Sequence, residues 1–550
     1  MARNSGAQFD AATRYDRQVR LWGEEGQASI GAATVCVLGS DSLATEILKS
    51  LTLAGIQSFH IVDDALVDIA DVGQNFFVHA DDVGKHRSEA TLEKLIELNP
   101  QVSGTFSSLP AACLTAADVE KLASFAVVVA ANQTEHIEQK FAGVLFELGV
   151  PFVAVKTFGL IGTVRVCVKE HTIANTHEEN PRPDLRLDVP FPALLEMVNE
   201  TNLGDLTVEQ LRHTPYLLLH FKALEAYRRE HNDPKAFPAS YAQRQEIQRI
   251  LRELRRAKDD GSGTKDSENF DEARLAVNRA FLKTTMDDSV RRVLADAHRS
   301  TSTQPFWLIC EALRRFVAAS GGLLPLHGTL PDMTSDTVRY TRLATLFHEK
   351  AIEDAQEVLR LTRAVEKERG VGDVISDEMC YRFCKNADRI CVQRGERVDS
   401  RRELAALISR IVAEEPEEPE GGGGGGRVSA ATWILLMRAV ERFRKEKGRF
   451  PGTNGVPVSI DAQDLRKRVE AIVKEAAESD STAQTVLTRV PDAAVSEMCR
   501  FGAAELHVVS SLIGGIAAQE IIKLATNQYV PIDNTFVFDG HTQHSATLKL

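Results

Sequence analysis

The amino-acid sequence predicts an α/β sheet domain that is interrupted by a large, mostly helical insertion. Near the N-terminus, two short apolar runs flank a helical stretch within 35–62, which is the pattern of a βαβ unit and therefore of a parallel sheet. Strand signals nearly vanish between 216 and 480. A helical stretch at 506–524 and strand-like runs at 529–538 and 545–550 then restore the first pattern. A chain that begins and ends as α/β indicates one sheet domain with an insertion.

The opening βαβ unit is recognised by the spacing of its apolar residues. Val35–Gly39 has the length of a buried strand, and Phe59–Val62 is a second apolar run, closed by Asp63 and Asp64. Between these runs, apolar residues recur at i, i+3, i+4 and i+7, as on one face of a helix, which Gly55 ends. The residues are Ala44, Ile47, Leu48 and Leu51. In such units the turn after the first strand commonly binds phosphate, and an acid after the second strand binds ribose.

Further elements extend the sheet domain to about residue 170. The expected elements are a helix at 83–98 and strands at 125–130, 151–155 and 162–168. Residues 171–215 carry many Pro, Asp and Asn and predict a crossover loop. The predicted domains are the first part of the sheet domain at 1–170, the helical insertion at 171–480 and the returning part of the sheet domain at 481–550.

The middle of the chain shows apolar stripes at helical spacing. They comprise Ile247, Ile250, Leu251 and Leu254; Phe306, Ile309, Cys310 and Leu313; and Trp433, Leu436, Met437 and Val440. The first dozen residues and the polar segment 258–268 are expected to be mobile. Residues 414–426, EEPEEPEGGGGGG, predict a flexible acidic loop. The sequence assigns no role to its glycine run at 421–426.

Composition narrows the class of protein. The chain has 550 residues, with 43% hydrophobic and 26% charged residues, which is typical of a globular protein with a large core. A net charge of −13 disfavours binding to nucleic acid or to an anionic membrane. We expect no transmembrane helix and no secretory signal. Eight scattered cysteines favour a reduced intracellular protein over a disulfide scaffold.

The turn after the first strand departs from a dinucleotide-binding fingerprint. The Gly-x-Gly-x-x-Gly positions hold Gly39, Asp41 and Ala44. Asp41 places a side chain and a negative charge where the backbone must approach phosphate. Two like unit charges ~4 Å apart repel by roughly 4 kcal/mol at an effective dielectric constant near 20, and the helix N-terminus offsets only part of this. We therefore expect a nucleotide-type fold whose own site is impaired, and a fold unit that binds no nucleotide is an open alternative.

Several separated segments carry a family resemblance. They are YDRQVRLWG at 15–23, GQNFFV at 73–78, VGKHRSEA at 83–90 and AAELHVVSSLIGGIAAQEIIK at 503–523. The chain resembles the activating enzymes of ubiquitin-like modifiers, which implies a Rossmann-like, ThiF/MoeB-type adenylation fold. Within that family, the segments 156–171 and 186–192, the terminal SATLKL and the length are most similar to the regulatory, non-catalytic subunits of neddylation-activating enzymes, also described as amyloid-precursor-protein-binding-like subunits.

The resemblance implies a reaction that this chain is poorly equipped to perform alone. Active members adenylate the modifier's C-terminal carboxylate with ATP and magnesium, and then hold the modifier as a cysteine thioester. Their phosphate-binding arginine corresponds to Gln74, and their magnesium-binding aspartate corresponds to Asn132. The second acid of their Asp-x-Asp pair corresponds to Ala65, which leaves Asp63, while Arg87 keeps a cation where they carry lysine. We therefore expect no cofactor in this chain, with ATP and magnesium in a partner subunit.

One catalytic group is implied to survive. In this family, the arginine of the YxRQ segment reaches into the ATP site of the other half of the assembly, and here it is Arg17. Its role would resemble that of an arginine finger supplied in trans. Gln18 and Arg20 are weaker candidates. From the residues alone, all three are equally compatible with a solvated helix face.

Cysteine and histidine residues do not form a recognisable catalytic set. Cys380 and Cys384 lie one helical turn apart, but no second pair or nearby histidine completes a zinc pattern. We expect both to be buried helical thiols rather than a thioester cysteine. Glu505 and His507 are two residues apart and do not share a helix face, so we interpret them as packing or interface residues.

The resemblance implies a regulatory subunit in a heterodimer, located in the cytoplasm and nucleus. The expected partners are the catalytic subunit and the neddylation modifier, which is passed on to cullins, with no nucleic acid and no membrane.

Three alternatives are open: an autonomous adenylating enzyme, a nicotinamide-dependent oxidoreductase and a scaffold subunit that contributes no group to chemistry. Gln74, Asn132 and Asp41 disfavour the first, the broken glycine fingerprint disfavours the second, and only Arg17 argues against the third.

Overall fold

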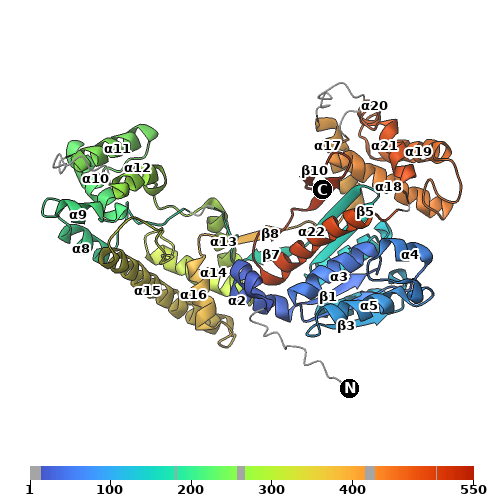
Figure 1. The fold of residues 1–550 in the computed structure, drawn as a ribbon, viewed down its shortest axis with the longest axis horizontal. Coiled ribbons are helices and arrows are strands. Elements are labelled where there is room, and N and C mark those ends of the chain that lie inside the picture. Colours follow the sequence, from blue (N-terminus) through green and yellow to red (C-terminus); the bar gives the residue numbers. More distant parts are fainter. Residues whose placement is uncertain (1–13, 180–181, 257–266, 415–427, 503) are drawn as a thin grey trace, which may run out of the picture. The chain divides into compact units, whose positions relative to one another are not determined.

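Figure 1 shows the fold of the chain in a computed structural model. The structure describes residues 14–179, 182–256, 267–414, 428–502 and 504–550. The predicted mobile leader, most of segment 258–268 and nearly all of the loop 414–426 lie outside the described residues. The chain forms two compact units, one made of 1–171 and 393–550 and the other of 172–392. The first unit contains the large sheet.

The first unit is organised around an eight-stranded sheet in the order β10-β9-β6-β5-β4-β1-β2-β3. The strands are β1 (Thr34–Leu38), β2 (Ser58–Val62), β3 (Ser103–Ser107), β4 (Val127–Ala131), β5 (Phe152–Phe158), β6 (Ile161–Cys167), β9 (Thr535–Asp539) and β10 (His544–Leu548). Strands β3, β2, β1, β4 and β5 pair in parallel, whereas β6, β9 and β10 add to them in antiparallel pairs. The predicted βαβ unit and parallel sheet are therefore confirmed.

Helices cover both faces of this sheet because its central strands are apolar on both sides. On β1, Val35 and Val37 belong to one core, and Cys36 and Leu38 belong to the core on the opposite face. The helices before and among the strands are α2 (Asp16–Ala32), α3 (Ser42–Ala54), α4 (Ile69–Gln74), α5 (Arg87–Leu98), α6 (Ala116–Lys121) and α7 (Glu135–Leu148), with short 3-10 turns at Ala80–Asp82, Ala111–Cys113 and Leu122–Ser124. Helix α3 ends at Gly55, whose φ is +83°, as the sequence predicts.

Helix α22 (His507–Thr526) is the apolar core helix of the returning segment. By length and composition, it is the one helix of the described residues that could cross a membrane. Here it packs with α3 and the sheet, and its buried residues Val509, Ile513, Ala517 and Ile521 join the core that contains β1. Its apolar character is therefore accounted for by burial inside the unit.

Five further helices belong to the unit that contains the sheet. The C-terminal end of the helical insertion therefore differs from the prediction. They are α17 (Ser400–Ala413), α18 (Ala430–Lys447), α19 (Val458–Ala476), α20 (Asp480–Thr488) and α21 (Asp492–Arg500). Their core includes Ile161 of β6, Val537 of β9 and Leu548 of β10. The insertion therefore ends at 392 rather than at the predicted 480. Helical spacing alone does not reveal that these helices pack on the sheet.

The second unit is mostly helical. Its helices are α8 (Pro192–Glu200), α9 (Val208–Arg212), α10 (Tyr216–Glu230), α11 (Tyr241–Arg256), α12 (Glu268–Ala280), α13 (Asp288–Arg299), α14 (Pro305–Ala319), α15 (Thr337–Arg369) and α16 (Asp377–Lys385). The long helix α15 contributes Leu343 and Phe347 to one core, and Val358 and Val365 to another. Strands β7 (Glu170–Ile173) and β8 (Cys391–Arg394) pair where the chain passes from one unit to the other.

Some local predictions differ from the structure. The predicted loop 171–215 contains β7, α8 and α9, because Leu194, Met197 and Val198 form an apolar stripe within a Pro- and Asp-rich stretch. The helix predicted at 83–98 begins only at Arg87. The strand predicted at 529–538 begins at Thr535. The three apolar stripes of the middle do lie on helices, namely α11, α14 and α18.

Candidate functional site

The fold places a candidate ligand site at the carboxyl end of β1. Strand β1 pairs with β2 on one side and β4 on the other, so this is the point where the strand order reverses and where ligands bind in folds of this kind. The turn begins at Gly39, whose φ is +107°. A Cβ at this position would lie 3.0 Å from the carbonyl oxygen of Ala131. The turn therefore requires glycine for both conformation and space.

Asp41 occupies the N-terminus of α3 with its own carboxylate. Its Oδ1 accepts a hydrogen bond from the backbone N–H of Ala44 at 2.9 Å, and its Oδ2 accepts one from Nδ2 of Asn132 at 2.9 Å. Burial raises the pKa of Asp41, and the nearby Arg87 partly opposes this rise. The side chain therefore takes a helix N-terminal donor that phosphate uses in nucleotide-binding folds.

Glu505 brings a second carboxylate to the same helix end. Its Oε2 accepts a hydrogen bond from the backbone N–H of Ser42 at 3.2 Å. Burial raises the pKa of Glu505 to about 8, and the neighbouring Asp41 adds to the rise. Two side chains of the protein thus bind the first N–H groups of α3, which leaves less opportunity for an external anion.

Arg87, the retained cation, is held by two aspartates. Its Nη2 lies 3.0 Å from Oδ2 of Asp63, and its Nη1 lies 2.9 Å from Oδ1 of Asp71. Its Nε also donates to Oγ of Ser40 at 3.2 Å. These carboxylates raise the pKa of Arg87 further. Asp63 lies where an acid binds ribose in such units, but here its carboxylate pairs with Arg87 at the end of β2.

Asn132 has a structural role at the position expected for a metal ligand. Its φ is +49°, in the left-handed region that asparagine tolerates. Its Oδ1 accepts a hydrogen bond from the backbone N–H of Thr157 at 2.8 Å, while its amide group donates to Asp41. The side chain therefore ties the end of β4 to β5 and to the turn. No group of three or more metal-ligating side chains occurs in the part of the chain that the structure describes.

The segment that carries Arg17 is anchored on one side and exposed on the other. The hydroxyl of Tyr15 accepts a hydrogen bond from Nδ2 of Asn99 at 2.9 Å, and the Trp22 ring packs edge-on against Tyr529, with centroids 5.1 Å apart. Arg17 is exposed on α2, and no described residue forms a hydrogen bond or ion pair with it. Arg20 is also exposed, but it pairs with Asp16 at 2.9 Å. Gln18 is half-buried.

Comparison with known proteins identifies the family. The ThiF family matches residues 15–550. The chain is 68% identical over 541 residues to a NEDD8-activating enzyme E1 regulatory subunit of Caenorhabditis elegans, covering 98% of this chain and 99% of that protein. It is 35% identical to the Danio rerio protein of the same name, with 98% of each chain covered. The chain belongs to the NEDD8-activating enzyme E1 regulatory subunits. The resemblance inferred from the separated motifs is therefore confirmed.

The thiols of this regulatory-subunit chain are mostly buried, as expected. Cys380 and Cys384 on α16 are 0% and 2% exposed. The hydrogen bond with Cys380 raises the pKa of Cys384, and burial adds to this rise. Only Cys113 is exposed, and Cys391 is intermediate. The prediction that the α16 cysteines are buried helical thiols is confirmed.

Sequence reasoning missed how Glu505 and Asp71 complete the site of this chain. Glu505 reaches Ser42 across 463 positions, so no local pattern signals the contact. Asp71 belongs to the capping box of α4, and its second oxygen reaches Arg87. The expected packing role of His507 is consistent with its contact to the buried Glu46, at 3.1 Å.

Proposed function

We propose that this chain is the regulatory subunit of a heterodimeric NEDD8-activating enzyme. ATP, magnesium and the thioester cysteine belong to a catalytic partner subunit, which adenylates NEDD8 and passes it on for cullin neddylation. The chain itself binds no cofactor in this account. The names of its relatives support the regulatory role, and the site supports the division of labour.

The observation that carries this proposal concerns the pocket at the carboxyl end of β1. Its polar and charged groups are already bound by other side chains of the same chain. Asp41 and Glu505 bind the N–H groups at the start of α3, and Arg87 is bound by Asp63 and Asp71. A nucleotide would have to displace carboxylates from the helix end and also separate an ion pair. Each of these steps costs free energy, because partly buried charges would lose their partners.

Arg17 supports a contribution to chemistry beyond scaffolding. It is exposed, whereas Tyr15 and Trp22 fix the segment on either side of it. A long cation on an anchored segment can reach a partner without reorganising the chain that carries it. In this proposal, the Arg17 guanidinium stabilises negative charge that develops at the phosphates in the partner's ATP site.

An apolar surface around α4 and the start of α22 is the proposed docking face for the catalytic subunit. Ile69, Phe76 and Val508 are 76%, 75% and 80% exposed. The rings of Phe76 and His507 lie 6.5 Å apart, which connects the end of α4 to α22. Exposed apolar surface of this kind marks interaction sites. Helix α22 and the sheet hold this surface on a rigid support.

The proposal is tested by NEDD8-dependent ATP–pyrophosphate exchange. The assay compares this chain alone, the catalytic subunit alone and an equimolar mixture. We expect exchange to be strongest in the mixture and absent with this chain alone. Robust exchange by this chain alone would instead establish an autonomous adenylating enzyme.

The docking face is tested separately by binding. Val508→Asp should weaken association with the catalytic subunit at least 10-fold, because it places a charge within the apolar surface. Val338→Asp is a matched control, since Val338 is 78% exposed on α15 in the other unit. Equal affinity of both variants would exclude this face as the docking site.

Two further elements of the proposal rest on the family and on composition. The proposal also includes a cytoplasmic and nuclear location, which is what the resemblance to the family implies. The net charge of −13 supports the expectation that neither nucleic acid nor an anionic membrane is a partner. A scaffold without a catalytic group is the second candidate function, and it is distinguished from the first by substitution of Arg17.

A further inference from the structure

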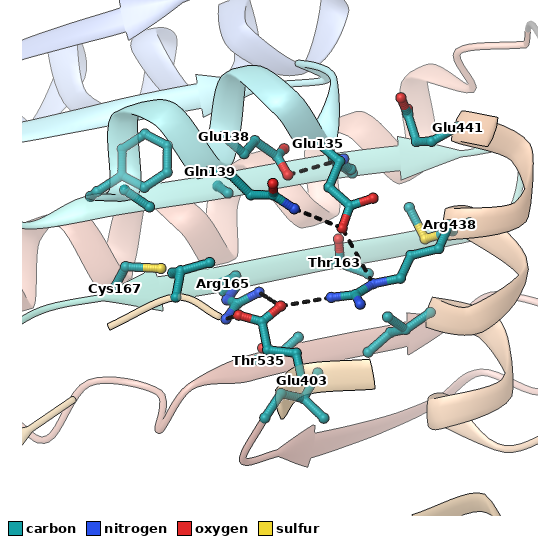
Figure 2. Close-up of a pocket in the computed structure, with 18 residues that line it drawn as sticks. Glu135, Glu138, Gln139, Thr163, Arg165, Cys167, Glu403, Arg438, Glu441 and Thr535 are labelled. Atoms are coloured by element: carbon teal, nitrogen blue, oxygen red, sulfur yellow. Dashed lines mark hydrogen bonds and ion pairs between the residues drawn. The ribbon is translucent and has the colours of Figure 1, made fainter. Parts of the chain in front are cut away.

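A second hollow lies next to the pocket at the carboxyl end of β1 that Gly39, Asp41 and Arg87 line, within the unit that contains the sheet. It is a cavity of about 90 Å³ bordered by α7, α17, α18 and strands β5, β6 and β9 (Figure 2). One water molecule needs roughly 10–15 Å³ of such space, so the cavity can hold a group of several atoms. Lys156, Met437 and Glu441 line both hollows. Its apolar lining consists of Ala142, Phe152, Ala154, Val398, Ile434, Met437 and Leu550.

One wall of the cavity is positively charged. Arg165 of β6 and Arg438 of α18 share the single carboxylate of Glu403, at 2.9 Å and 2.6 Å. These two guanidinium groups face the single carboxylate of Glu403, and Glu135 of the opposite wall lies 3.7 Å from Nε of Arg438. Nε of Arg165 is also buried and has no hydrogen-bond partner among the described residues. This wall therefore offers cationic donors to an anion.

The wall formed by α7 is negatively charged. Oε2 of Glu138 pairs with Nζ of Lys156 at 3.0 Å, but its Oε1 is buried and has no hydrogen-bond partner among the described residues. Oε1 of Glu135 accepts a hydrogen bond from Gln139 at 3.0 Å and lies 3.7 Å from Nε of Arg438. Burial raises the pKa of Glu138 to about 7, and Lys156 opposes this rise. A cation placed at this wall would stabilise the ionised carboxylate.

The two walls and the apolar lining together define a ligand class. Figure 2 shows Glu135 and Glu138 on the α7 side of the cavity, with Arg165 and Glu403 on the side facing them. A buried donor and a buried acceptor without partners are costly unless a bound group satisfies them. We propose that this cavity binds a small zwitterion with an apolar side chain, such as a free α-amino acid of the leucine or phenylalanine type.

The proposed binding mode follows from the charges. The ligand carboxylate lies at Arg165 and Arg438, and its ammonium group lies at Glu138. Its side chain packs against Phe152 and Met437 and displaces water from the apolar lining. No step of NEDD8 activation is required for this binding, so the proposal does not depend on the proposed function.

Calorimetric titration of the full-length chain tests the proposal with five probes. L-Leucine and L-phenylalanine should bind saturably and raise the melting temperature. Isoamylamine lacks the carboxylate, 4-methylpentanoate lacks the ammonium group and glycine lacks the side chain, so each should bind at least 10-fold more weakly than L-leucine. Equal binding of L-leucine and its fragments, or no saturable binding by any probe, would overturn the proposal and leave a cavity that holds water only.

Variants locate the binding in this cavity. Glu138→Gln should lower the affinity for L-leucine and for isoamylamine at least fivefold. The affinity for 4-methylpentanoate should not change. Glu147→Gln is the matched control, because Glu147 lies on the same helix with a side chain 58% exposed. If Glu138→Gln does not fold, Glu441→Gln neutralises the same rim from α18 and should shift affinity in the same direction. Unchanged L-leucine affinity in a folded variant would overturn the assignment.

Discussion

Nη2 of Arg87 lies 3.0 Å from Oδ2 of Asp63, and both side chains are largely buried at the carboxyl end of the sheet. Asp71 holds the other arm of the same guanidinium at 2.9 Å. The positive charge that this chain retains at its degenerate site is therefore used for internal structure. A group committed in this way contributes to stability instead of to phosphate binding.

Replacing Arg87 should therefore cost stability. Arg87→Met leaves Asp63 and Asp71 without their cation, and removing one partner of a largely buried pair typically costs about 3 kcal/mol. Urea denaturation of the isolated chain measures the change. Arg291→Ala is a suitable control, because its side chain is 67% exposed and should change stability by less than about 0.5 kcal/mol. An equally small loss for Arg87→Met would contradict the structural role.

The turn after β1 should not tolerate a side chain at residue 39. Gly39→Ala must adopt a φ of +107° and places Cβ 3.0 Å from the Ala131 carbonyl oxygen, so we expect a loss of about 2 kcal/mol. Gly73→Ala is the matched control, because it lies in α4 with no atom within 4 Å of its added Cβ. That variant should be neutral or slightly stabilising. Thermal unfolding of both variants provides the comparison.

Glu505 should make the stability of the fold depend on pH. Its pKa rises from an ordinary value of 4.5 to about 8 in the folded chain. The folded state therefore binds a proton more tightly than the unfolded state, and stability falls as pH rises between these values. Glu505→Gln should flatten the change in melting temperature from pH 5 to pH 8, by the equivalent of about 1–2 kcal/mol after allowance for partial exposure. The exposed Glu478→Gln should keep the wild-type profile, and an unchanged profile for Glu505→Gln would refute the assignment.

His541 should also make the stability of the fold decrease as pH rises, because its favourable positive charge is lost on deprotonation. Its Nδ1 lies 2.9 Å from Asp539 and its Nε2 lies 2.9 Å from Glu497, and only the protonated imidazolium can donate to both carboxylates. Both carboxylates raise its pKa, against the opposing effect of burial. The stabilisation is complete below pH 6.5 and is lost as pH rises through the elevated pKa of the folded state.

The comparison of His541→Gln with the unmodified chain checks this dependence. The variant should be less stable by about 1–2 kcal/mol at pH 6 and close to the unmodified chain at pH 9. Trp433 stacks on the ring with centroids 5.5 Å apart, so its fluorescence should change over the same pH range. Equal destabilisation at both pH values would show that the ring acts through packing alone.

Sequence patterns predict the core of the sheet domain well, because local spacing determines it. The alternation of apolar runs and helical stripes defines β1, α3 and β2, and the misfit of Asp41 in the glycine fingerprint indicates an altered site. Spacing cannot show which partner neutralises a charge. The contact between Glu505 and Ser42 depends on the tertiary fold, and so does the packing of α17–α21 on β6 and β9 that places the boundary at 392.

The most direct test of the central claim is ATP–pyrophosphate exchange by the assembled heterodimer carrying Arg17→Ala. The partner-binding affinity of the variant is measured first, and Lys474→Ala on α19 is the control for loss of an exposed cation. A catalytic group supplied in trans predicts a rate at least about 10-fold lower for Arg17→Ala alone, which corresponds to about 1.4 kcal/mol of lost transition-state stabilisation. A rate equal to that of the control, with the heterodimer intact, would contradict the claim and leave this chain as a scaffold.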